Sequence, residues 1–267
     1  MPLSGQVNGG GEDGGGEEGS GVPTATVVIE CNRVRVDFKG VTDVLSSHYW
    51  DFGDGSPVVK DSLNITHYYT DANFYTMKWK YRVSPLVAWT EYEFPVKAIF
   101  VGSGCGSVRK ISDLLAKNVL TASPLVGATL YSFGDLEADM NYIFDGCHAK
   151  ILPGSLIKVI NGKQLTLQNG TYEAHLQQDC DKDMWNGFQV IGASSLVAYG
   201  TLIQDALYGI SPVEISAANL PRLALNGTIF EGNYIGINAT SGRFSLQQFQ
   251  NNRFAGKYIP LEPKFCS

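Results

Sequence analysis

The sequence predicts an all-β protein in which a β-sandwich precedes a parallel β-solenoid, and three observations support this. Residues Gly200–Ile210 are echoed 27 positions later by Gly227–Ile237, and a looser third copy begins at Asn252. Repeats of this length, with short strands and Gly or Asn corners, are typical of β-solenoids. Upstream, the region after Thr24 has the two-residue period of half-buried strands. A short apolar alternation precedes each repeat copy: Leu196-Val197-Ala198, Leu223-Ala224-Leu225 and Phe244-Ser245-Leu246.

Composition restricts the classes of partner. The 267 residues carry a net charge of −6, and four acidic residues among the first 23 leave only −2 for the rest. This near-neutral balance argues against nucleic acid and anionic membrane as partners. The chain has no run of 18 apolar residues, so we expect no transmembrane span. No apolar signal peptide follows Met1.

The first part of the chain divides into a linker and a sandwich. Residues 1–23 include nine glycines and predict a flexible linker, with calcium or partner binding by its acidic run as the weaker alternative. In the following segment Trp50 and Phe52 fall on one face of a strand and are expected to anchor a sandwich core. The pair Asp54-Gly55 predicts a tight turn.

The same segment resembles a known domain family. Trp50-Asp51-Phe52-Gly53-Asp54-Gly55-Ser56, followed by His67-Tyr68-Tyr69, is similar to the signature of PKD domains. The resemblance covers residues 24–101 and implies a seven-stranded immunoglobulin-like β-sandwich. Such domains act as spacers and as adhesion or glycan-contacting modules of extracellular proteins. The interpretation of Asp51 and Asp54 as a calcium or catalytic pair is weaker than that of a hydrogen-bonded turn. The residues to which the resemblance gives a structural role are Trp50, Asp51, Phe52, Gly53, Asp54, Gly55, His67 and Tyr69.

The second part predicts a connector and then the solenoid. We expect residues 102–140 to connect the domains and to cover the N-terminal end of the solenoid, with a single helical turn near Ile111–Ala116 as one alternative. From Asn141 the alternation of short strands with Gly or Asn corners is the rhythm of a parallel β-helix. Residues 141–267 then form about five rungs of roughly 25 residues each. Because no capping segment follows the last repeat, the solenoid is predicted to be truncated, a fragment of a longer chain.

This half also resembles the right-handed parallel β-helix region of large secreted Bacteroidetes proteins. In that group PKD modules and β-helices share one chain, and many members are exported by the type IX secretion system. The resemblance implies a secreted or outer cell-surface location. Its carriers are Cys147, Pro153, Gly154, Leu165, Leu167, Cys180, Trp185, Gly187, Asp205, Ala206, Tyr208, Gly209, Phe230, Asn233, Gly236 and Ile237.

The five cysteines show no zinc-binding spacing. Buried thiols and one or two disulfides are both open, and a disulfide between Cys147 and Cys180 is favoured slightly. About one rung separates these two residues, and stacked rungs bring such residues close together.

The sequence predicts no catalytic, cofactor-binding or metal-binding residues. Calcium is the one weakly supported ion, because Asp179-Cys180-Asp181-Lys182-Asp183 has a loop-like spacing but lacks the glycine and closing glutamate of an EF-hand. Asp205 is interpreted as a corner residue, and His148 and His175 as structural histidines without an obvious partner. The aromatic residues Trp79, Tyr81, Trp89 and Tyr92 either stack on sugars or cement the interface between the two domains.

These observations predict a non-catalytic extracellular or cell-surface module of a larger protein. It would act as a spacer, an adhesion scaffold or a glycan-contacting scaffold, monomeric, with a polysaccharide or another surface glycan or protein as partner. The alternative is a fragment of a carbohydrate-active β-helix enzyme, either a polysaccharide lyase or a glycoside hydrolase. An enzyme should bring two carboxylates, or a carboxylate and a Lys or Arg, together in one groove.

Overall fold

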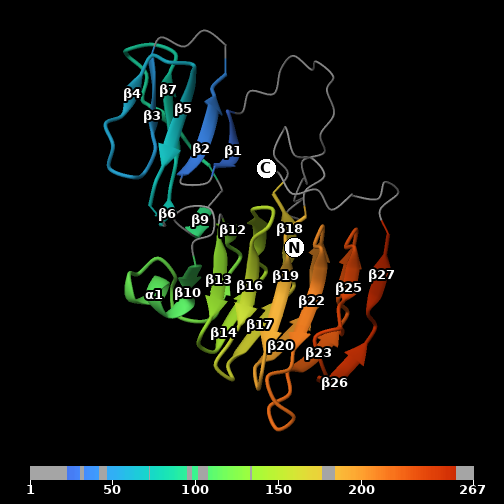
Figure 1. Cartoon of the computed structure of the whole chain (residues 1–267). Coiled ribbons are helices and arrows are strands. Elements are labelled where there is room, and N and C mark those ends of the chain that lie inside the picture. The colour runs from blue at the N-terminus through green and yellow to red at the C-terminus, as the bar shows by residue number, and fades with distance from the viewer. Residues whose placement is uncertain are drawn as a thin grey trace, which may run out of the picture.

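The computed structural model describes residues 23–30, 33–41, 47–71, 73–94, 98–101, 108–132, 134–175 and 184–256. The predicted all-β class is confirmed, because strands make up 56% of the structure and helix 3%. Figure 1 shows a smaller body of antiparallel strands above one end of a long stack of parallel strands. No helix in the described part of the chain is long and apolar enough to cross a membrane.

The N-terminal body consists of two antiparallel sheets, hereafter the sandwich. The first has the order β1-β2-β5, with the strands β1 (Thr24–Glu30), β2 (Arg33–Lys39) and β5 (Asn64–Tyr69). The second has the order β4-β3-β7-β8, with the strands β4 (Val59–Lys60), β3 (Ser47–Asp51), β7 (Lys78–Arg82) and β8 (Thr90–Glu93).

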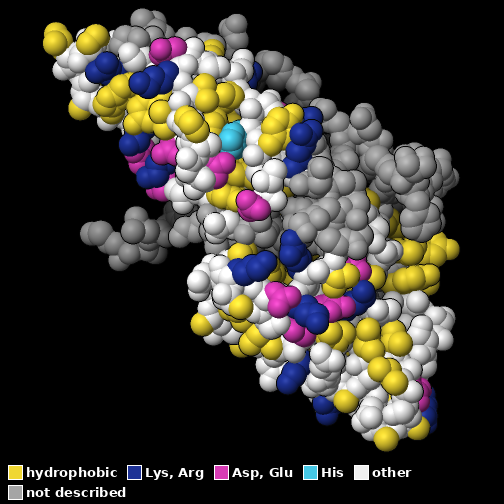
Figure 2. Space-filling view, turned by 60° about the vertical axis from the view of Figure 1, so that its left-hand side comes forward, with side chains coloured by type: hydrophobic (Ala, Val, Ile, Leu, Met, Phe, Trp, Pro, Cys, Tyr) yellow, Lys and Arg dark blue, Asp and Glu magenta, His cyan; other side chains and the backbone are white. Residues whose placement is uncertain are grey.

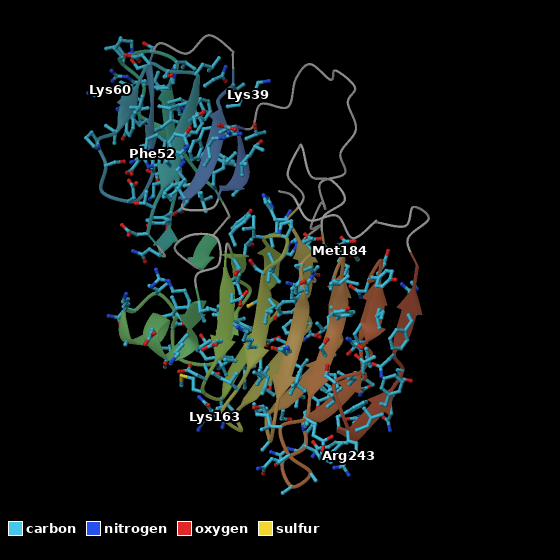
Figure 3. All side chains as sticks on the ribbon, in the orientation of Figure 1. Lys39, Phe52, Lys60, Lys163, Met184 and Arg243 are labelled. Carbon is cyan, nitrogen blue, oxygen red and sulfur yellow. The ribbon has the colours of Figure 1, made fainter. Side chains whose placement is uncertain are left out.

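Side chains from both sheets form one hydrophobic core. In β2 every second residue is buried, so Val34, Val36 and Phe38 all point inward. From the facing sheet Trp50 is 1% exposed and Phe52 2%, which confirms that these two anchor the core. The Phe38 ring lies 5.1 Å from that of Trp50. The stick view places Phe52 within this body (Figure 3).

Three further sheets form the solenoid, and their strands run parallel from rung to rung except for β6, which pairs antiparallel with β9. The first sheet contains β10 (Val108–Lys110), β13 (Asp135–Ala138), β16 (Leu156–Val159), β19 (Gly187–Ile191), β22 (Tyr208–Val213) and β25 (Ile235–Ile237). The second contains β11 (Leu125–Val126), β14 (Tyr142–Asp145), β17 (Gln164–Gln168), β20 (Ser195–Tyr199), β23 (Arg222–Asn226) and β26 (Ser245–Gln250). The third contains β6 (Phe74–Tyr75), β9 (Ala98–Val101), β12 (Thr129–Ser132), β15 (His148–Ile151), β18 (Thr171–Ala174), β21 (Leu202–Gln204), β24 (Ile229–Glu231) and β27 (Arg253–Ala255).

The solenoid core is built from side chains that stack from one rung to the next. Leu165, Leu196 and Leu223 occupy one ladder position in three successive rungs, and each is fully buried. Aliphatic side chains therefore form a continuous ladder along the solenoid. The repeat register is confirmed, because Leu202 pairs with Ile229, which pairs with Arg253.

The apolar alternation before the third repeat copy pairs irregularly. Leu223 pairs with Leu246, a β-bulge follows, and Phe244 lies just before β26. The predicted start of the solenoid near Asn141 is wrong, because the solenoid begins earlier. The strands β10 to β13 are already members of its sheets, but they are only two to four residues long. A helix at Ile111–Ala116 separates β10 from β11, so the first rung lacks the regular alternation of strands and corners by which the later rungs are predicted.

One column of corners lies where the chain turns from the second sheet to the third. All six corner residues are Gly or Asn with φ between 51° and 65°, in the left-handed region that these two residue types tolerate best. In the five corners before Asn251, the backbone N–H of the corner residue donates to a carbonyl oxygen of the next rung, at 2.8–2.9 Å. The ladder therefore continues through the turn. The column consists of Gly127, Gly146, Asn169, Gly200, Gly227 and Asn251.

The two bodies are joined by more than a chain connection. Strand β6 follows the sandwich strand β5 and pairs antiparallel with β9, which in turn pairs parallel with β12 of the solenoid. Tyr131 of β12 and Leu152 belong to the sandwich's hydrophobic cluster. Near the same end, the helix α1 (Ile111–Ala116) buries Ile111 and Leu114 in the solenoid core, so the helical alternative for this segment is confirmed (Figure 1).

We predict that Gly187→Ala and Gly162→Ala will have very different costs although both glycines have positive φ. A Cβ on Gly187 would lie 1.6 Å from the carbonyl oxygen of Tyr208, whereas one on Gly162 would meet its nearest neighbour at 3.9 Å. Gly162→Ala should lower the free energy of unfolding by about 1 kcal/mol. Gly187→Ala should cost more than about 4 kcal/mol or prevent folding. Denaturant unfolding followed by circular dichroism measures both, and equal losses would contradict the clash.

Candidate functional site

The turn that follows β3 holds two signature carboxylates, and their contacts are structural. Asp51 Oδ1 accepts a hydrogen bond from the backbone N–H of Gly53 at 3.0 Å, and Asp54 Oδ1 accepts one from that of Ser56 at 3.0 Å. The second oxygen of Asp54 lies 2.7 Å from His67 Nε2. Because each carboxylate is engaged in its own turn, the geometry favours the hydrogen-bonded turn over a calcium or catalytic pair.

Two side chains of β5 fasten this turn to the first sheet. The His67 ring stacks on Phe52 with centroids 3.9 Å apart, and the Tyr69 hydroxyl donates to the Phe52 carbonyl oxygen at 2.9 Å. Burial raises the pKa of Asp54, but hydrogen bonds from Ser56 and His67 outweigh burial, so the pKa is lowered overall. Asp54 therefore accepts these hydrogen bonds as a carboxylate at neutral pH.

Of the four aromatic residues predicted to stack on sugars or to cement the domain interface, only Trp89 is well exposed, and Tyr92 packs against the sandwich core. The prediction is wrong for Trp79, which is 1% exposed because the strand alternation of β7 turns it inward, onto the ring of Trp50 at 5.7 Å. Tyr81 points the same way, is half-buried and stacks on Trp79 at 4.8 Å. Trp89 lies in the β7–β8 loop and is 41% exposed.

Trp89 forms part of a surface that we call the aromatic shelf, composed of Tyr49, Lys80, Arg82, Trp89 and Glu91. The Trp89 and Tyr49 rings meet edge to face with centroids 5.0 Å apart. The Arg82 guanidinium lies 4.6 Å from the centre of the Trp89 ring, and Lys80 Nζ lies 5.9 Å from that of Tyr49. The shelf therefore combines aromatic rings with charged donors and acceptors on the outer face of the second sandwich sheet.

Ion pairs hold the charged side chains of this face in place. Lys80 and Lys78 of β7 both contact Glu91 of β8. The hydrogen bond from Lys80, then that from Lys78, lowers the pKa of Glu91, and the bond with Glu91 raises the pKa of each lysine. All three groups are therefore charged at neutral pH. Each pair is solvent-exposed, so it orders the surface more than it stabilises the fold.

The solenoid carries a second polar group, which we call the Glu173 cluster: His148, Lys150, Glu173 and Gln204. These side chains come from the adjacent strands β15, β18 and β21 of the third sheet. Glu173 Oε1 lies 2.6 Å from His148 Nε2 and 3.6 Å from Lys150 Nζ. Its other carboxylate oxygen accepts a hydrogen bond from the Gln204 amide. His148 thus has a partner that the sequence interpretation missed, because the two residues meet only through the rung register.

The Glu173 cluster has the composition of an acid–base site but an exposed position. Burial raises the pKa of Glu173, whereas the His148 hydrogen bond and the charges of His148 and Lys150 lower it, and the lowering prevails. Glu173 is therefore a carboxylate at neutral pH and orients the imidazole. The His148 and Lys150 side chains are 43% and 35% exposed, so the cluster lies on a sheet face rather than in a deep cleft.

Calcium, the one ion that the sequence weakly supports, has no group of three or more candidate ligands in the described part of the chain. The same holds among the described residues for any other metal that His, Cys, Asp or Glu side chains could hold. The Asp179–Asp183 segment lies outside those residues. Asp205 is buried with φ 58°, and the equivalent Gly232 has φ 64°, so the interpretation of Asp205 as a corner is confirmed.

Cys147 is a free and fully buried thiol, whereas its predicted disulfide partner Cys180 lies outside the described residues. Its Sγ donates to the carbonyl oxygen of Leu125, one rung away, at 3.3 Å. Thr201 and Thr228 follow later corners of the same column, and their hydroxyls donate across a rung in the same way. Burial raises the pKa of the Cys147 thiol, so it behaves as a neutral structural donor.

His175 lies where the solenoid meets the sandwich. It is 8% exposed, its ring hydrogen-bonds to the backbone of Val27 in β1, and it contacts Tyr131 edge to face at 5.8 Å. Burial and then the charge of Lys150 lower its pKa to about 4, against the opposing effects of the Val27 bond and Glu173. The sequence interpretation of His175 as structural agrees with this position.

Comparison with known proteins adds no family assignment. No protein-family model, curated protein or solved structure matches this chain. The PKD and secreted β-helix resemblances therefore remain predictions that depend on their motifs.

We predict that His175 makes stability depend on pH between about 6.5 and 4. Its folded pKa of about 4 lies below the ordinary 6.5, so the unfolded chain binds a proton first and stability falls as pH falls through this window. The loss should be on the order of 3 kcal/mol by pH 4. Urea unfolding at several pH values measures it, with His175→Gln as the control that removes this slope. Parallel pH profiles for both proteins would contradict the assignment.

Proposed function

We propose that the chain is a non-catalytic module of a secreted or cell-surface protein, a scaffold that contacts glycans through the aromatic shelf. The observation that carries the proposal is the exposed Trp89 ring, set against Tyr49 and flanked by charged side chains. Sugar rings present apolar C–H faces that pack on aromatic rings, and hydroxyls that bond to charged groups. The shelf offers both kinds of contact on one face.

The architecture supports a scaffold role. A solenoid with stacked side-chain ladders is stiff along its length, and its rungs spread polar side chains in rows over a long surface. We propose that its winding is right-handed and that the sandwich is a PKD-like immunoglobulin domain. The His67 and Tyr69 contacts to the β3 turn support the second point, since they give the signature residues one structural task. Secretion by a Bacteroidetes type IX system stays part of this proposal.

The second candidate function is a carbohydrate-active enzyme, and the Glu173 cluster is the observation that favours it. Glu173 and Lys150 form the carboxylate and lysine pair that such a site needs, and His148 adds an imidazole, the side chain that most often serves as a general acid or base. We rank it second because the cluster is exposed and Glu173 is satisfied by three neighbours.

We predict that the purified chain binds selected oligosaccharides on a glycan array and that Trp89→Ala weakens binding at least about tenfold, the effect of roughly 1.4 kcal/mol. The matched control is Tyr234→Ala, which removes an aromatic ring that is 62% exposed on the solenoid. Titration calorimetry with the best oligosaccharide gives both affinities. Equal losses in the two variants, or retention of binding by Trp89→Ala, would remove the shelf from the proposal.

The enzyme alternative predicts a different result from the same incubations. Shortened products detected by mass, and abolished by Glu173→Gln with binding retained, would replace the scaffold proposal by catalysis at the Glu173 cluster. We expect unchanged oligosaccharide masses over long incubations. Glu173→Gln keeps the shape of the side chain, so loss of fold would not be confused with loss of chemistry.

A further inference from the structure

The β7–β8 hairpin ends in an apolar loop whose side chains face solvent. Residues Val83–Trp89 contain no charged side chain. Leu86 is 96% exposed, Val83 56% and Val87 48%, and we call these three the apolar tip. Since β8 leads from the loop toward β9 and the solenoid, the tip lies at the far end of the sandwich. Solvent-facing aliphatic clusters of this kind mark surfaces that meet an apolar partner.

The backbone of the tip forms hydrogen bonds within the hairpin. The Val87 N–H donates to the Ser84 carbonyl at 3.0 Å, and the Leu86 N–H donates to Ser84 Oγ at 3.3 Å. Pro85 has no N–H, and its carbonyl oxygen accepts a hydrogen bond from Arg82 at 3.4 Å. These bonds satisfy two N–H groups and two carbonyl oxygens of the loop from within, which lowers the cost of moving it into an apolar medium.

Polarity is graded along the hairpin, from the tip toward the solenoid. After the aliphatic side chains come Trp89 and Arg82, with the guanidinium over the ring. Next comes the cross-strand pair of Lys80 with Glu91, and then Lys78. A bilayer changes in the same order: hydrocarbon, an interface favoured by Trp and by Arg, and charged headgroups in water. Figure 2 shows hydrophobic and basic side chains together at the end of the sandwich farthest from the solenoid.

We propose that the apolar tip inserts into a phospholipid bilayer, with Arg82 and Lys80 level with anionic headgroups. The local charge distribution permits this although the whole chain is acidic, because the loop itself is uncharged and the charge nearest to it is Arg82, while Lys80 lies level with Glu91. A protein pocket could also take up an aliphatic tip, but it would not require the graded order of the flanking side chains. The inference does not depend on glycan binding, although insertion would bring the aromatic shelf to headgroup level.

The full chain offers a built-in probe for this test. Trp50, Trp79 and Trp185 are at most 1% exposed, so Trp89 is the one tryptophan whose surroundings would change on insertion. Vesicles of phosphatidylcholine, with and without phosphatidylglycerol, are added to the protein. We expect a blue shift of tryptophan emission together with co-sedimentation, both stronger with phosphatidylglycerol.

Two variants make the result specific. Leu86→Ser should reduce the vesicle partition coefficient about tenfold, since a large buried aliphatic side chain is lost from the lipid phase. Ile215→Ser, at a residue 71% exposed on the solenoid, should leave partitioning unchanged.

Equal partitioning of Leu86→Ser and the parent chain would overturn the proposal. So would failure of the parent chain to bind either vesicle, which would leave a protein partner for the tip. Soluble-glycan affinity should not change in Leu86→Ser, so this result is separable from the shelf's function.

Discussion

The rest of the solenoid depends on the column of left-handed corners between its second and third sheets. The first five corners continue the backbone hydrogen-bond ladder around the turn, so each of these rungs is held in register with the next. The residue after the corner then points inward, and Cys147, Thr201 and Thr228 use this position to donate hydrogen bonds across a rung. The same register also aligns the outward-facing side chains of successive rungs in rows. Glu173 can meet His148 and Gln204 only because three strands start in step.

Much of this architecture could be predicted from the sequence because corners and ladders leave local marks. Gly200 and Gly227 head two similar segments, and the segments do pair. The first rung has no such repeated segment, since the helix α1 interrupts it between β10 and β11. The shift near Leu246 could not be foreseen, because a bulge changes the register without changing the composition. Local patterns therefore predict long, regular strands and fail where pairing partners decide the structure.

The candidate sites show the same division. Asp51, Asp54 and Asp205 could be interpreted correctly because turn residues act on their own backbone. The prediction that Trp79 contacts glycans is wrong, although the alternation Lys78-Trp79-Lys80-Tyr81-Arg82 places it on the face opposite the lysines. That face is turned into the core. The Glu173 cluster and the buried contacts of His175 depend on residues far apart in the chain. Their chemistry is set by register and by the junction, which no single segment encodes.

The strand β6 gives the molecule a property that neither body has alone. It extends a solenoid sheet to the sandwich, where Tyr131 and Leu152 join the same core. The β7–β8 hairpin is therefore connected to the solenoid through paired β-strands rather than through a flexible linker. A surface that holds the hairpin also sets the height and tilt of the solenoid, and so determines which of its rows faces outward. The distance between the hairpin and the far end of the solenoid is then set by the length of the stacked β-structure, whereas a flexible linker would let this distance fluctuate.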